Sequence, residues 1–343
     1  MRNLILTLCI GSLFGCDWNK PAYPTDPIAE QMLVYQRNNG GWTQYQGDPT
    51  HYEQPFGDSL RTAVLADKDS LDATIDDHST SGEITYLLRA YQETGNPNYL
   101  QAAEKGIEYL LEAQYANGGW PQFYPRTTGY HAYITYNDNA MIEVLQIMQA
   151  LKEGHGNVAP VRPELKTAAA RAMKKGLDCI LKTQVVEAGN PTVWCAQHQH
   201  ETLLPAPGRT FEPPSLSGAE SVNIVRFLMS LDSPSVAVKR AVQGAAAWFE
   251  EVKIEGWNYK SIADSTQPSG RDRIIYPDSS STIWARFYEL ETFRPIFAGR
   301  DAVIHYELKE VENSRRIGYA YYGKWPQDLL DIEYPQWVSR HEQ

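Results

Sequence analysis

The sequence is short of basic residues. It holds 31 lysines and arginines against 42 aspartates and glutamates, which gives a formal net charge of −11. A protein that binds nucleic acid needs a basic surface to contact the phosphates, so this balance argues against nucleic acid as the main partner. Any polyanionic ligand would have to be held by a basic patch confined to one part of the surface.

The chain also lacks an apolar run long enough to span a membrane. The N-terminal run Leu4–Leu13 is too short for a transmembrane helix and is typical of an export signal. It ends in Leu13-Phe14-Gly15-Cys16, which resembles a bacterial lipobox and implies lipidation of Cys16. We therefore predict a signal peptide over 1–16, a tether over 17–27 and an exported protein anchored by lipid in the bacterial cell envelope, periplasmic or surface-exposed. The alternative is an ordinary signal peptide with a chance cysteine.

Cysteine is scarce, with four in 343 residues. Cys9 would leave with the signal peptide and Cys16 would carry the lipid. The remaining pair, Cys179 and Cys195, could form a disulfide bond in an oxidising compartment or remain two buried thiols. The sequence leaves both alternatives open, and it contains no Cys/His spacing typical of a metal site.

An internal near-repeat organises the rest of the chain. Gln36–Trp42 (QRNNGGW) recurs as Gln114–Trp120 (QYANGGW), and a degraded third copy covers Gln184–Trp194. Each copy follows a stretch with apolar residues at helical spacing, and Asn-Gly-Gly is typical of a helix end. The repeat therefore predicts helical hairpins of about 70 residues each.

Further helices are expected between and after these copies. Their predicted bounds are Ser79–Thr94, Asn139–Lys152, Pro163–Lys182, Ser217–Leu231 and Val236–Lys253. Strand alternation is scarce, and only residues 302–308 indicate a short strand. We predict one catalytic domain over 28–343, mainly α, built as an α/α toroid (barrel) of repeated helical hairpins with long aromatic-rich loops on one binding face.

Two of the expected helices begin at acidic residues. Asp76-Asp77-His78 precedes one helix and Asn137-Asp138-Asn139 precedes another, with 62 positions between Asp76 and Asp138. Each aspartate could simply cap its helix. In a fold of repeated hairpins the two turns could also meet on one face, where carboxylate oxygens would suit Ca²⁺.

Basic and aromatic residues indicate where an acidic sugar chain could bind. Arg209 lies in a loop stiffened by four prolines, which suits a fixed role, although an ion pair with Glu212 is the simpler interpretation. Arginine binds carboxylates in bidentate fashion, and a second basic cluster could supply the required patch. Its members are Arg286, Arg294 and Arg300. Trp120 and other loop tryptophans could stack on sugar rings, or they could be core residues.

Four motifs together resemble polysaccharide lyase family 10, the helical pectate lyases, over residues 28 to about 305. They are Asn117–Gln122 (NGGWPQ), Ile134–Met141 (ITYNDNAM), Arg209–Ser215 (RTFEPPS) and Ala285–Thr292 (ARFYELET). The resemblance implies the same toroid fold and an enzyme that cleaves polygalacturonate and oligogalacturonides with calcium as cofactor. We expect a monomer, although the sequence leaves the oligomeric state open.

The resemblance also assigns roles to single residues. Arg209 matches the catalytic base, Asp138 a calcium ligand, and Asp76 an essential aspartate of the same centre. Arg294 matches a residue that binds a substrate carboxylate. Possible helpers in substrate binding are Arg286, Arg300, Lys260 and Trp120.

The implied reaction is β-elimination, and it sets a condition on the base. Arginine has a pKa above about 12, so a neutral Arg209 requires an electropositive site and predicts an alkaline optimum. Two other functions on the same toroid remain alternatives. A glycoside hydrolase would use two carboxylates, such as Asp76 and Asp138, and would need no calcium. A non-catalytic pectin-binding lipoprotein would use Arg209 only to hold carboxylates.

Overall fold

The structure is a computed structural model that describes residues 23–44, 50–54 and 57–341. The predicted signal peptide, Cys16 and most of the tether lie outside the described residues. No helix in the part of the chain that the structure describes is long and apolar enough to cross a membrane. Cys179 and Cys195 are both buried free thiols, so the structure contains no disulfide bond between them.

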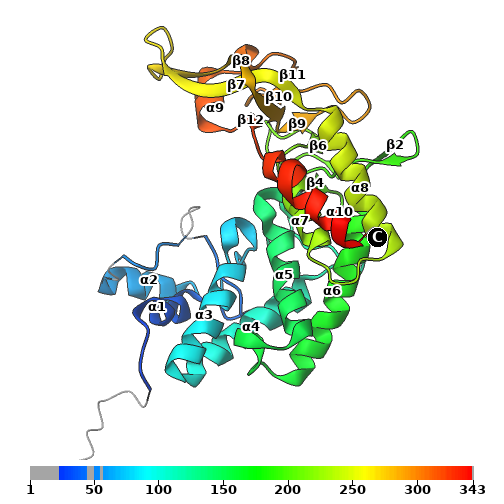
Figure 1. Cartoon of the computed structure of the whole chain (residues 1–343). Helices are drawn as coiled ribbons and strands as arrows, with labels where there is room; N and C mark the ends of the chain where they lie inside the picture. Colours follow the sequence, from blue (N-terminus) through cyan, green and yellow to red (C-terminus); the bar gives the residue numbers. More distant parts are fainter. Residues whose placement is uncertain (1–22, 45–49, 55–56, 342–343) are drawn as a thin grey trace, which may run out of the picture.

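Ten α-helices carry most of the core (Figure 1). They are α1 (Pro27–Tyr35), α2 (Asp58–Ala66), α3 (Ser81–Thr94), α4 (Pro97–Ala113), α5 (Ala140–Glu153), α6 (Pro163–Thr183), α7 (Glu220–Met229), α8 (Val236–Glu251), α9 (Asn313–Gly318) and α10 (Tyr334–His341) within the described ranges. Short 3₁₀ turns precede two of them, η1 (Asp76–His78) before α3 and η3 (Asn137–Asn139) before α5.

Twelve strands form five small antiparallel sheets in the described chain. They are β1 (Ile134–Thr135), β2 (Val186–Glu187), β3 (Asn190–Pro191), β4 (Gln197–His198), β5 (Pro205–Ala206), β6 (Leu216–Ser217), β7 (Ile254–Ala263), β8 (Arg271–Ala285), β9 (Phe287–Tyr288), β10 (Phe297–Ala298), β11 (Ile304–His305) and β12 (Tyr322–Gly323). The sheet orders are β1-β4-β5, β2-β3, β6-β9, β10-β11 and β12-β8-β7.

The prediction of a mainly α toroid was wrong, because the molecule combines helices with many short sheets. Most strands have only two residues, so they leave no periodic pattern in the sequence; they form where loops meet and pair their backbone groups. The long hairpin of β7 and β8 was missed because no residue of β7 is buried, so this strand has no face of alternating buried apolar residues to mark it in the sequence. The strand predicted over 302–308 is reduced to β11.

The predicted helices are confirmed, with small shifts at their starts. The prediction Ser217–Leu231 becomes α7, which begins at Glu220 because the Ser217 hydroxyl accepts hydrogen bonds from the backbone N–H groups of Ala219 and Glu220. This is the local competition that places serine ahead of a helix. Helix α6 begins at Pro163 as predicted, since proline fits the first turn.

The helices pack in two layers. Helix α3 contacts α5, and α5 contacts α7, while α4, α6 and α8 form a second row behind them. The closest pairs are α3 with α4 and α5 with α6, which are consecutive in sequence. Figure 1 shows β7 and β8 projecting from the end of the molecule opposite α1 to α4. The turns before α3 and α5 therefore lie at the same ends of neighbouring helices.

The sequence near-repeat has the same structural role in each copy. The side-chain amides of buried Gln36 and half-buried Gln114 each donate to a carbonyl of their own loop and to one on a later helix, Ala102 and Ala172 respectively. Gln184 does the same with Thr192 and Ala241, so the degraded third copy is confirmed. The tryptophan that ends each copy returns its indole N–H to the helix just ended, on the carbonyls of Met32, Leu110 and Ile180.

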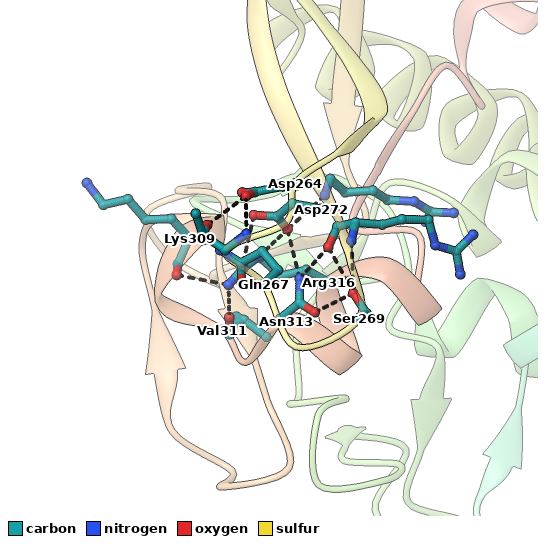
Figure 2. Close-up of polar contacts among 11 residues, drawn as sticks. Asp264, Gln267, Ser269, Asp272, Lys309, Val311, Asn313 and Arg316 are labelled. Atoms are coloured by element: carbon teal, nitrogen blue, oxygen red, sulfur yellow. Dashed lines mark hydrogen bonds and ion pairs between the residues drawn. The ribbon is translucent and has the colours of Figure 1, made fainter.

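A buried ion pair attaches the β7–β8 hairpin to α9 (Figure 2). The guanidinium of Arg316 donates to both carboxylate oxygens of Asp272, at 2.8 and 2.7 Å, and to the carbonyls of Lys309 and Val311. Asn313 adds a hydrogen bond of 2.8 Å to the carbonyl of Arg271. Arg316 and Asp272 are only 6% and 8% exposed, so each charge depends on the other.

We expect either single substitution at this pair, Arg316→Met or Asp272→Leu, to lower the free energy of unfolding by about 3–5 kcal/mol, because it leaves one charge buried without its partner. The double variant should lose clearly less than the sum of the two. Urea unfolding of the four proteins measures both effects. Losses that simply add would show that the two groups contribute independently.

Candidate active site

The two acidic turns share one unusual backbone shape. In η1, Asp77 and His78 have φ of 45° and 64°; in η3, Asp138 and Asn139 have φ of 48° and 65°. Asp, Asn and His tolerate this left-handed region better than other side chains do. The turns therefore correspond at an interval of 61 residues, which pairs Asp77 with Asp138. The same interval aligns Thr74-Ile75-Asp76-Asp77-His78 with Thr135-Tyr136-Asn137-Asp138-Asn139.

Hydrogen bonds connect each turn, or the start of the helix that follows it, to the next helix in the layer formed by α3, α5 and α7. The Ser81 hydroxyl at the start of α3 donates to the carboxylate of Glu143 on α5, at 2.6 Å. The Asn223 amide on α7 donates to the Asn139 side chain in η3, also at 2.6 Å. These two bonds hold consecutive turns side by side, and so bring their aspartates to one face.

The turns open into a polar cavity of about 210 Å³. Residues distant in the sequence line it: Gln44, Asp76, Asp77, Gln122, Phe123, Tyr130, His131, Asn137, Asp138, Gln197, Arg209 and Glu212. Three predicted site residues, Asp76, Asp138 and Arg209, therefore meet here. Larger hollows exist, but this cavity gathers the titratable groups with perturbed pKa values, which makes it the candidate active site.

Three carboxylates in this cavity fit a metal ion. One oxygen each of Asp76, Asp77 and Asp138 lies within 4.8 Å of the others. The buried Oδ1 of Asp76 has no hydrogen-bond partner among the described residues, although a buried polar oxygen ordinarily has one. A hard divalent cation such as Ca²⁺, which takes carboxylate and carbonyl oxygens, would satisfy this atom and the three charges together.

The crowding of negative charge contributes to raised pKa values of Asp76 and Asp138. Burial, followed by the charges of Asp77 and Asp138, raises the pKa of Asp76 to about 6. Burial also raises the pKa of Asp138, and Glu220 and Asp77 raise it further. In the absence of a cation the folded protein therefore carries a repulsion that the unfolded chain does not.

Arg209 faces the trio from the proline-rich loop. Its Nε donates to Glu212 Oε2 at 3.0 Å and its Nη2 donates to Glu212 Oε1, while its backbone N–H donates to Oε2 at 2.8 Å. Burial alone would lower the pKa of Arg209, but the bonds and charge of Glu212 hold it above its usual value. The phenol of Tyr319 donates to the same Glu212 at 3.0 Å. The expected ion pair with Glu212 is thus present within the site.

Arg286 lies outside the cavity lining but interacts electrostatically with Asp138 of the trio. It forms an ion pair with Glu220, donates to the Ala320 carbonyl at 2.9 Å, and its Cζ lies 5.0 Å from the Tyr319 ring centroid. Its positive charge lowers the pKa of Asp138, in opposition to burial. Arg286 therefore balances the acidic turns electrostatically, although it does not line the cavity.

Four other predicted residues lie elsewhere. Arg294 stacks over Tyr306 at 3.6 Å, Arg300 donates to Ser314 at 2.8 Å, and Lys260 lies over Tyr276 at 4.2 Å. None of the three lines the cavity. Trp120 is wholly buried with its indole bonded to Leu110, so the prediction that it contacts substrate does not fit and the core interpretation holds.

The sequence analysis missed two residues that the structure places at the site. Asp77 completes the trio, and its signal was available in the alignment of the two turns at an interval of 61 residues. Tyr319 reaches Glu212 from a segment 107 residues further along the chain, and no local pattern marks it.

Comparisons with known proteins match most of the chain to one family. A family model described as pectic acid lyase matches residues 32–330. A solved family 10 polysaccharide lyase from Cellvibrio cellulosa is 31% identical, with 91% of each chain covered and a TM-score of 0.79. A mutant of the Cellvibrio cellulosa family 10 lyase, in complex with trigalacturonic acid, is 30% identical over 90% of this chain and 92% of that one, with a TM-score of 0.78. The search of curated proteins gives no match.

We expect Asp76→Asn to stabilise the chelator-treated protein at pH 8 by about 1–3 kcal/mol, because the raised pKa of Asp76 means that its ionisation opposes folding. This contribution to stability is fully present below the unfolded pKa of 3.8 and is lost as the pH rises through about 6. The advantage of the variant should therefore vanish near pH 4. Thermal unfolding at the two pH values measures it.

Calcium provides the matching control. It should raise the melting temperature of the wild-type protein, by binding the folded state, and raise that of Asp76→Asn much less. Equal calcium shifts in both proteins would exclude Asp76 as a ligand.

Proposed function

The chain belongs to the pectic acid lyase family, and we propose that it cleaves α-1,4-linked polygalacturonate by calcium-assisted β-elimination with Arg209 as the base. The observation that carries the proposal is the meeting of Arg209 with the aspartate trio in one cavity. The solved relative in complex with trigalacturonic acid supports an oligogalacturonide as the ligand.

The reaction requires removal of the proton on C5, which is α to the substrate carboxylate. The C5–H bond breaks, its electrons form a double bond between C4 and C5, and the bond from C4 to the glycosidic oxygen breaks. The leaving oxygen takes a proton from water. Bound calcium, held by Asp76, Asp77 and Asp138, would withdraw charge from the substrate carboxylate and make the C5 proton more acidic. The chain's own residues must then supply the base.

Contacts of Arg209 select which of its nitrogens can accept this proton. Nε and Nη2 each keep a hydrogen that is donated to Glu212, whereas Nη1 makes no hydrogen bond to any residue that the structure describes. A neutral guanidine carries its lone pair on one nitrogen, so the Glu212 contacts favour Nη1 as that nitrogen. Glu212 acts as a positioning residue, comparable with the acid that fixes the tautomer of a catalytic histidine.

The contact with Glu212 also makes the neutral form of Arg209 harder to reach. The charge of Glu212 favours the protonated form of Arg209, so the neutral base forms only at alkaline pH or when other positive charge enters the site. A cation at the trio and the nearby Arg286 both act in that direction. The Tyr319 phenol, by donating to Glu212, weakens the hold of Glu212 on the proton of Arg209.

The spacing of the carboxylates favours elimination over hydrolysis. A glycoside hydrolase places its acid and base about 5 Å or more apart, on either side of the bond that is cleaved. Here three carboxylates crowd together on one side of the cavity, as metal ligands do. The family match and the lyase structures also favour elimination over hydrolysis and over binding alone.

We further propose that the protein is exported and anchored by lipid at Cys16, on the strength of the lipobox-like Leu13–Cys16. When the full chain is expressed in a bacterium, the wild-type protein should separate with the membranes and lose residues 1–15, while Cys16→Ser should remain unlipidated. Mass spectrometry of the mature N-terminus decides this. An unmodified wild-type cysteine would contradict the anchor.

We expect the protein without its signal peptide to release unsaturated products from polygalacturonate, detected by ultraviolet absorbance, with a rate that rises towards alkaline pH and is abolished by a chelator. Arg209→Ala should reduce kcat by at least about a thousandfold, because it removes the base. Shortened chains without the absorbance would indicate hydrolysis, and an optimum near pH 5 would contradict Arg209 as the base.

Glu212→Gln tests, in the same assay, whether the negative charge of Glu212 controls the pKa of Arg209. It lowers the pKa of Arg209 by removing the ion pair, so the rising limb of the pH profile should move to lower pH while the maximal rate falls. An unchanged profile would show that Glu212 does not control Arg209.

A further inference from the structure

One guanidinium beside the candidate active site has no acidic partner. Arg209, Arg286 and Arg316 are each paired with a carboxylate. Arg315, by contrast, forms no ion pair within the described part of the chain; its one hydrogen bond, to the Gly318 carbonyl, is long at 3.4 Å, and its buried Nε has no partner there. In a protein with an excess of acidic residues, a half-buried arginine left unpaired requires an explanation.

Arg315 packs against the ring of Phe211, which the proposed base, Arg209, also contacts. Its Cζ is 4.2 Å from the centroid of Phe211, and the Cζ of Arg209 is 4.9 Å from the same centroid. The Tyr319 ring packs edge-on against Phe211 and lies 5.4 Å from the Arg315 Cζ. The two guanidinium groups are therefore neighbours across one ring, and Arg315 extends the positive wall of the site beyond the cavity itself.

The anchor shown in Figure 2 holds Arg315 in this place. Arg316 is fixed by Asp272 and by the carbonyls of Lys309 and Val311, and it belongs to the same short helix, α9. Consecutive side chains on a helix point about 100° apart. When Arg316 is buried against the hairpin, Arg315 must point to another side, which is where Phe211 lies. Little conformational freedom remains to be lost when Arg315 binds a ligand.

We propose that Arg315 binds the carboxylate of a galacturonate residue next to the one that is cleaved, and so positions the polymer beside Arg209. This rests on the proposed function. A uronate chain carries one carboxylate per sugar, so a chain with one carboxylate at the aspartate trio presents others along the neighbouring wall. A planar guanidinium with unused donors matches a carboxylate through two parallel hydrogen bonds.

The test is steady-state kinetics on polygalacturonate with Arg315→Ala, Arg315→Lys and the control Arg240→Ala. Arg240 is exposed on α8 and, among the residues that the structure describes, its side chain donates only to the Gly189 carbonyl, so its loss controls for the overall change of charge. We expect Arg315→Ala to raise KM about 10- to 100-fold, the range for loss of a charge-assisted contact, with kcat within about twofold. Arg315→Lys should recover part of the loss, because lysine keeps the positive charge but lacks the paired N–H donors of the guanidinium.

The direction of the change decides the role of Arg315. An unchanged KM in Arg315→Ala, or a fall in kcat alone, would overturn the proposal. A lower melting temperature with unchanged KM would assign Arg315 a structural cation–π contact only.

Direct binding distinguishes this proposal from the function on which it rests. Calorimetry with tetragalacturonate compares Arg209→Ala with the double variant Arg209→Ala/Arg315→Ala, and needs no turnover. Weaker binding in the double variant supports Arg315 even if the wild-type protein proves not to be a lyase. Equal affinity, or no binding by either protein, overturns the role of Arg315, while unsaturated products from the wild-type enzyme would still establish the lyase.

Discussion

Three glutamine amides connect the loops of the helical part of this molecule to its helices. Gln36, Gln114 and Gln184 each satisfy a carbonyl in a loop and another on a helix about 60 residues away. A carbonyl group in a tight loop has no partner within its own element and is costly when it is buried without one, whereas the helix carbonyls reached here lie inside α4, α6 and α8 and accept the amide as a further hydrogen bond. One side chain thus closes each loop and ties it to the back layer. The regular stacking of helices, on which the position of both acidic turns depends, follows from this contact.

The site that results is a balance of opposed charges. Three aspartates lie together, and the raised pKa values of Asp76 and Asp138 reflect their burial and the neighbouring negative charge. Two arginines lie near them, each paired with a glutamate: Arg209 with Glu212 and Arg286 with Glu220. An acidic protein can accept an acidic polymer at such a place because the local arrangement, and not the net charge, sets the field that the ligand meets.

The strand-rich C-terminal third completes the site from a distance. The β7–β8 hairpin and α9 are joined by the buried ion pair of Arg316 with Asp272 and by hydrogen bonds of Asn313. The segment that follows delivers Tyr319 to Glu212 and places Arg315 against Phe211. Part of the surroundings of Arg209 is therefore built by a segment more than 100 residues away, held by a charge pair that does not itself line the cavity.

The sequence by itself determined the helices, their pairing and the chemistry to expect. Apolar spacing and Asn-Gly-Gly ends are local properties, and the motifs around Asp138 and Arg209 were sufficient to indicate the family. Tertiary structure alone decided what those residues meet. Two-residue strands leave no periodicity, so the toroid prediction overlooked the sheets. The burial of Trp120, the separation of Arg294, Arg300 and Lys260 from the cavity, and the arrival of Tyr319 and Arg315 beside Glu212 and Phe211 all depend on contacts between distant segments, which no local pattern encodes.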